Sequence, residues 1–145
     1  METTIIVRAI HFISIFFVVA SVFAEFILVK PKLIRTQISL LSKIDALYGI
    51  SSILVVGAGL LLWFVVGKSP EYYAGNHIFF TKIGLFTLVG LLSLYPTIFF
   101  FKNRKGNMDD EVIMPKSIKT VIIIEFCILL IIPFLASAMA AGIGR

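Results

Sequence analysis

The chain has 145 residues, of which 59% are hydrophobic and only 14% are charged. This composition excludes an ordinary soluble domain and predicts an integral membrane protein whose surroundings are the lipid bilayer. The net charge of +5 comes from connecting segments and not from one basic face. It therefore indicates orientation in a membrane and excludes nucleic acid as an expected partner.

Four apolar segments, each long enough to cross a bilayer, account for nearly the whole chain. They cover about residues 5–29, 46–66, 78–101 and 118–141. The first segment could be mistaken for a signal peptide, but its apolar run has spanning length, so we expect a retained helix. Residues 1–145 are predicted to form one all-α domain, a four-helix transmembrane bundle.

The first apolar segment carries a stripe of polar residues. Ionisable side chains are costly inside a bilayer, so we expect such a stripe to face the interior of the bundle. On a helix, its members fall within an arc of about 140°. They are Arg8, His11, Ser14, Ser21 and Glu25.

The connections between the apolar segments differ in charge. Those after the first and third segments are rich in Lys and Arg, and the first of them is expected to run as a polar loop from Lys30 to Lys43. The connection 67–77 contains only one Lys or Arg, which is Lys68. The positive-inside rule then places the basic connections in the cytoplasm and both termini outside, in the cytoplasmic (inner) membrane of a bacterium. Small residues in the second and fourth segments leave monomer and homodimer both open.

Acidic residues gather toward the cytoplasmic side of the predicted bundle. From the helical rise, Glu25 lies about 10 Å and Glu125 about 6 Å from the membrane centre, with Asp45 and Tyr48 nearer the cytoplasm. These four residues are predicted to form an inner acidic cluster. A proton relay would need a continuous polar path, which apolar layers interrupt. We therefore favour a structural role, with neutralisation by basic side chains that reach the cluster: Lys30, Arg35, Lys43 and Lys119.

Basic residues gather in the outer half. His11 and Lys82 each lie about 10 Å outside the centre, and no carboxylate shares their level. An anionic group from outside the chain would satisfy them. Haem b fits this requirement, with His11 as a ligand of the haem iron and with Arg8 and Lys82 binding the propionates.

Two alternatives for His11 remain open. A single intramembrane histidine is more often hydrogen-bonded to a neighbouring helix than bound to haem. Copper could be held by His11, Met139 and Cys127, but the chain contains no paired Met-x-x-Met or His-x-His motif and the spacing points Cys127 away from Met139.

Several short motifs carry a family resemblance. They are Arg8-Ala9-Ile10-His11, Lys82-Ile83-Gly84-Leu85, and Glu125 with Pro133-Phe134. Over essentially its whole length the chain resembles an uncharacterised family of predicted bacterial inner-membrane proteins. More distantly, it resembles HemJ-type protoporphyrinogen oxidases and the membrane domain of CopD copper-resistance proteins.

The resemblance to HemJ-type proteins implies a four-helix membrane bundle that binds haem b and oxidises a porphyrinogen. The catalytic histidine and lysine would be His11 and Lys82. HemJ-type sequences usually carry another histidine late in the third span, where this chain has Leu92-Ser93-Leu94. Three hypotheses follow: a haem- or tetrapyrrole-binding redox protein, a small transporter or ion-handling protein, and a structural membrane subunit.

Overall fold

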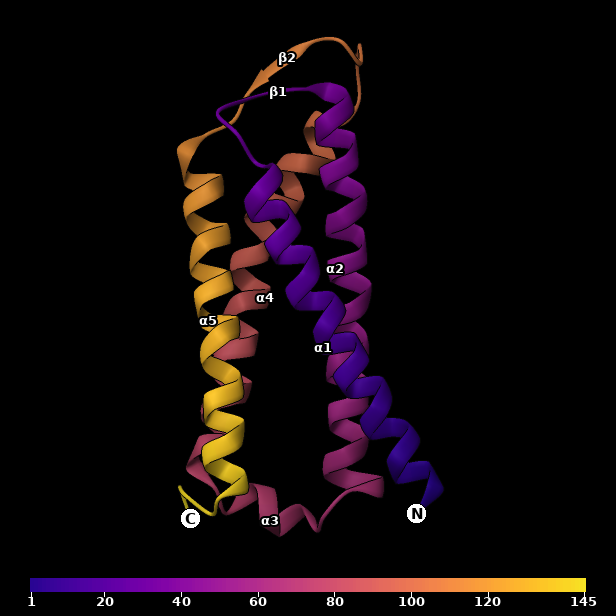
Figure 1. Cartoon of the computed structure of the whole chain (residues 1–145), viewed down its shortest axis with the longest axis vertical. Coiled ribbons are helices and arrows are strands. Elements are labelled where there is room, and N and C mark those ends of the chain that lie inside the picture. Colours follow the sequence, from indigo (N-terminus) through magenta and orange to yellow (C-terminus); the bar gives the residue numbers. More distant parts are fainter.

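The computed structural model describes all residues from Met1 to Arg145 and consists of four long helices (Figure 1). Each is long and apolar enough to cross a membrane. This confirms the prediction of an all-α transmembrane four-helix bundle. The helices are α1 (Glu2–Leu28), α2 (Arg35–Leu61), α4 (His77–Asn103) and α5 (Lys116–Ala140), and α2 continues as a π-helical segment, η1 (Leu62–Val66).

The helices form a ring in which sequence neighbours run in opposite directions (Figure 1). Helix α1 packs against α2 and α5, and α4 packs against the same two helices, so α1 and α4 lie on a diagonal without an extensive interface. Both termini lie at one end of the bundle, which we call the terminal end, and α1 leans away from α5 toward it. The assignment of this end to the outside remains a prediction from charge.

The opposite end carries a two-stranded antiparallel sheet, and we call it the sheet end (Figure 1). Strand β1 (Lys32–Ile34) pairs with β2 (Glu111–Ile113). The sequence analysis did not predict these strands. It was also wrong about the connection from Lys30 to Lys43, because α2 begins at Arg35. Ile38 and Leu41 are buried in the core, which stabilises the additional helical turns.

Arg35, the first residue of α2, binds the connection between α4 and β2 through hydrogen bonds. Its guanidinium donates hydrogen bonds to the carbonyl oxygens of Asn103 at 2.8 Å, Lys105 at 2.7 Å and Asn107 at 3.2 Å. It also lies 3.8 Å from the Asp110 carboxylate. The backbone amides of Arg35 and Thr36 also donate to the carbonyls of Asp110 at 3.0 Å and Met108 at 3.2 Å, so the start of α2 holds the loop in place mainly through the loop's backbone carbonyls.

The terminal end is closed by the short helix α3 (Pro70–Ala74) and by the last residues of the chain. Asn76 is buried, accepts a hydrogen bond from the Ile78 amide at 2.9 Å and donates one to the Ile143 carbonyl at 3.0 Å. The backbone amide of His77 donates to the Gly144 carbonyl at 2.9 Å. These bonds tie the C-terminus to the beginning of α4.

The bundle has a narrow core and an apolar exterior. Only 25 of the 145 residues are buried, whereas large side chains such as Phe16, Ile53 and Phe134 are 71%, 73% and 78% exposed. Surfaces of this kind are unfavourable in water and match the hydrocarbon region of a bilayer.

Candidate functional site

Three carboxyl groups meet inside the half of the bundle nearest the sheet end. Glu25 is in the last turns of α1, Asp45 is in α2 and Glu125 is in α5, and their exposed fractions are 2%, 6% and 1%. Tyr48, one turn after Asp45, is 4% exposed. The structure therefore brings together the four residues that the sequence assigned to the inner acidic cluster.

Several polar groups of this cluster lack hydrogen-bond partners. Asp45 faces Glu25 and Thr97 on α4, without a hydrogen bond of good geometry to Thr97. The Tyr48 hydroxyl faces Ser52 and Ser93 without a hydrogen bond of good geometry. Buried oxygens without a partner are Glu25 Oε1, Glu125 Oε1, Tyr48 Oη and Ser52 Oγ.

No basic side chain neutralises the cluster, which corrects the sequence-based interpretation. The only ion pair within 4.0 Å in the structure joins Arg35 to Asp110. Lys119 donates instead to the Val29 carbonyl at 3.1 Å. Lys30 and Lys43 are exposed. The depth of a lysine in the membrane did not determine whether it pairs with the carboxyl groups, because backbone carbonyls at the helix ends compete for the same cations.

An apolar layer separates the cluster from the terminal half of the bundle. Val18, Val89 and Leu129 are 1%, 0% and 6% exposed and belong to one hydrophobic cluster. On the other side, Ile38, Leu41, Phe100, Ile118 and Ile122 of the same hydrophobic cluster are buried between the carboxyl groups and the sheet end, so apolar side chains enclose the carboxyl groups on both sides.

The outer basic residues are less buried than the inner acidic ones. His11 is half-buried, and its Nδ1 lies 3.1 Å from the Val55 carbonyl oxygen on α2. Lys82 is half-buried as well, near enough to His11 for their charges to interact, and its Nζ lies 5.9 Å from the centre of the Phe79 ring. Arg8 is exposed, so the N-terminal end of the predicted stripe does not face the bundle interior.

The structure does not assemble the copper ligands considered from sequence. Cys127 is exposed on α5, whereas Met139 near the end of the same helix is 6% exposed. No group of three or more His, Cys, Asp or Glu side chains is arranged to hold a metal ion. This also applies to the three inner carboxyl groups.

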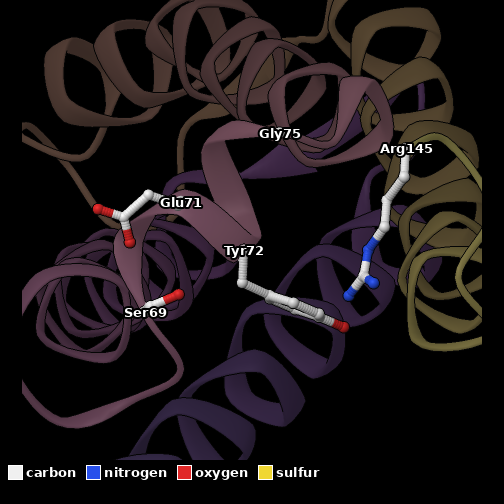
Figure 2. A pocket seen from close by; sticks show the side chains of 5 residues that line it. All are labelled: Ser69, Glu71, Tyr72, Gly75 and Arg145. Carbon is white, nitrogen blue, oxygen red and sulfur yellow. The ribbon is translucent and has the colours of Figure 1, made fainter.

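An open hollow of about 400 Å³ lies at the terminal end, and Tyr72, one of its lining residues, is near enough to Lys82 for their charges to interact. Figure 2 shows Tyr72 and Arg145 pointing toward one another across the hollow, and the guanidinium carbon lies 4.4 Å from the ring centre. Hydrogen bonding by the Lys68 ammonium, and then the charges of Lys68 and Arg145, lower the pKa of the Tyr72 phenol. The hollow is shallow and is lined by few side chains, and it contains no evident catalytic group.

Comparison with known proteins places the chain in a family. The model of a family described as "Predicted membrane protein (DUF2214)" matches residues 3–144. The chain belongs to this family. No curated protein and no solved structure matches it. Membership in DUF2214 agrees with the near resemblance, whereas the more distant resemblances to HemJ-type and CopD proteins receive no support.

Sequence reasoning missed the contribution of α4 to the inner cluster. Ser93 and Thr97 are spaced four residues apart and therefore lie on one face of a helix. They share that face with Val89, Pro96 and Phe100, which are buried. This periodicity was a usable signal, but single hydroxyl groups are common in transmembrane helices and did not stand out.

Proposed function

We propose that this DUF2214 protein handles protons, and that Glu25, Asp45 and Glu125 are its proton-binding groups. The observation that carries the proposal is the burial of three carboxyl groups from three helices without a cation in ion-pair distance. We further propose that it is a multi-pass protein of the bacterial cytoplasmic membrane, with the cluster facing the cytoplasmic side.

The energetics favour protons as the ligands of the cluster. Moving a carboxylate into a low-dielectric interior costs several kcal/mol, even after relaxation. Three adjacent carboxylates would also repel one another. Protonation removes both costs and lets one carboxyl donate a hydrogen bond to the next, as the contact between Glu25 and Asp45 allows. A metal ion is the weaker alternative because the ligands do not converge on one point.

Buried apolar side chains enclose the carboxyl groups on both sides. The Tyr48 hydroxyl lies beside them and faces Ser52 and Ser93, Val18 and Val89 close the path toward the terminal end, and Leu41 and Phe100 close the path toward the sheet end. In this arrangement protons reach the cluster, and leave it for either side of the membrane, only when the helices move.

Infrared spectroscopy of the purified protein in lipid nanodiscs tests the proposal. Near neutral pH we expect the carbonyl stretching band of protonated carboxylic acids, reduced in Glu25→Gln, Asp45→Asn and Glu125→Gln. Asp110→Asn is the matched control, because Asp110 is 55% exposed and lies outside the cluster, beside Arg35. A wild-type spectrum without a protonated-acid band would refute the proposal.

A proton flux assay then distinguishes proton transport across the membrane from proton binding without transport. Proteoliposomes with a pH-sensitive dye inside should equilibrate an imposed proton gradient faster than empty vesicles. Glu125→Gln should remove the difference, and Asp110→Asn should retain it. A protonated cluster without flux would restrict the function to proton binding.

We retain haem b binding as a second proposal because of one observation. The Val55 carbonyl can only accept a hydrogen bond, so the His11 Nδ1 next to it carries a proton and Nε2 of the neutral ring keeps its lone pair. Histidines that bind metals are commonly oriented in this way. In this proposal Lys82 would act with His11 in catalysis, and Arg8 would have to turn inward. A Soret band in the wild type that is lost in His11→Ala would support it, and a colourless protein that does not take up added haem would exclude it.

A further inference from the structure

A second feature of the sheet end is a small basic hollow between the end of α1 and the beginning of α5. Its volume is about 230 Å³. The hydrogen bond from the Met114 amide to the Pro31 carbonyl, at 2.8 Å, holds its two sides together. The lining residues are Val29, Lys30, Pro31, Met114, Pro115, Lys116 and Lys119.

The three lysines of this hollow have no acidic partner. The ion pair between Arg35 and Asp110 is the only one in the structure, so Lys30, Lys116 and Lys119 keep uncompensated charges. Lys119 is held in place, because its Nζ donates to the Val29 carbonyl at 3.1 Å. Three cations around one hollow repel one another, and an anion placed among them would relieve that repulsion.

An aromatic surface continues from the hollow into the membrane along the contact between α1 and α5. The Lys119 Nζ lies 5.2 Å from the centre of the Phe26 ring. Phe26 stacks on Phe126 with 6.4 Å between ring centres, and Phe23 lies 5.6 Å from Phe126. Phe23 is 44% exposed. Cationic groups thus stand directly above apolar side chains that face lipid.

We propose that this surface binds one acidic phospholipid from the leaflet at the sheet end. Its phosphate occupies the hollow among Lys30, Lys116 and Lys119, and its acyl chains lie along Phe23 and Phe126. Clusters of basic residues at the membrane boundary attract anionic lipids. A soluble anion would satisfy the lysines but would leave the aromatic surface without a role, so a lipid fits the whole surface better.

Native mass spectrometry of the intact protein in detergent tests this inference with dioleoyl phosphatidylglycerol as the probe. We expect retention of one phosphatidylglycerol molecule and weak retention of dioleoyl phosphatidylcholine. Lys116→Gln and Lys119→Gln should each weaken phosphatidylglycerol binding about fivefold. Lys43→Gln, an exposed lysine at the same end on α2, should leave binding unchanged.

Further measurements distinguish the sources of the anion. Phe23→Ala should weaken binding of phosphatidylglycerol, and millimolar inorganic phosphate should not displace the lipid. Circular dichroism of each variant establishes that the helices are intact. Equal retention of both lipids, equal loss in Lys43→Gln, or displacement by phosphate would each overturn the proposal. None of these results depends on whether the carboxyl cluster binds protons.

Discussion

Replacement of Arg35 by alanine is expected to destabilise the bundle considerably, although the residue lies near the surface. Its side chain is 17% exposed and donates three hydrogen bonds to backbone carbonyls. A hydrogen bond from a charged group contributes about 1.5–3 kcal/mol when buried. Because two of these bonds are exposed, we discount them and expect a total loss of about 2–4 kcal/mol for Arg35→Ala.

The ion pair with Asp110 should contribute much less to this total. The carboxylate is 55% exposed and lies 3.8 Å from the guanidinium, and exposed ion pairs contribute about 0–1 kcal/mol. Asp110→Ala should therefore be nearly neutral. Arg35→Lys should recover only part of the stability, because an ammonium cannot reach three separated carbonyls in the way that a guanidinium does.

Reversible unfolding of the protein in mixed detergent micelles, followed by circular dichroism, gives the free energy of unfolding for each variant. Lys32→Ala serves as a control at an exposed neighbouring position. If Asp110→Ala proved as destabilising as Arg35→Ala, the ion pair and not the carbonyl contacts would hold the loop, and our reasoning would be wrong.

Further predictions concern the half of the bundle nearest the terminal end. Gly59→Ala places a Cβ 3.3 Å from Cε1 of His11 and should cost about 1 kcal/mol, whereas Gly57→Ala meets nothing within 4 Å and should be neutral or stabilise by about 0.5 kcal/mol. Both are measured by the same unfolding assay. Asn76→Ala removes a helix cap and a buried hydrogen bond, so it should cost about 2 kcal/mol and increase hydrogen exchange near the C-terminus. A reporter enzyme that is active only outside the cytoplasm should be active when it is fused after Arg145. Activity of a reporter that works only in the cytoplasm, fused at the same position, would contradict the predicted orientation.

The helical spans and much of the inner cluster could be predicted from the sequence. Hydropathy over about 20 residues determines where a chain can cross a bilayer, and helical periodicity placed Ser14, Ser21 and Glu25 on the buried face of α1, where the structure has them. Arg8 was placed on the same face but is exposed. The reason is the tilt of α1 away from α5, which depends on packing between helices and not on any single helix.

The partners of the charged residues could not be predicted in the same way. Depth along the membrane normal placed Lys119 within reach of the acidic cluster, but the Val29 carbonyl at the end of α1 accepts its hydrogen bond. The strands β1 and β2 have three residues each, too few for an alternating pattern to be visible. Both features arise from contacts between segments that are distant in sequence.

The strand pairing has a consequence for biosynthesis. The most extensive helix contacts are between α1 and α2 and between α4 and α5, so the chain consists of two helical hairpins, each with one strand in its connecting loop. As the ribosome delivers the chain, the first hairpin can enter the membrane while β1 still lacks its partner. Leu33 can pair with its opposite residue, Val112, only after the chain has been synthesised through β2. The sheet therefore joins the two hairpins late, and a chain cut within the connection 67–76 and expressed as two pieces should still assemble around it.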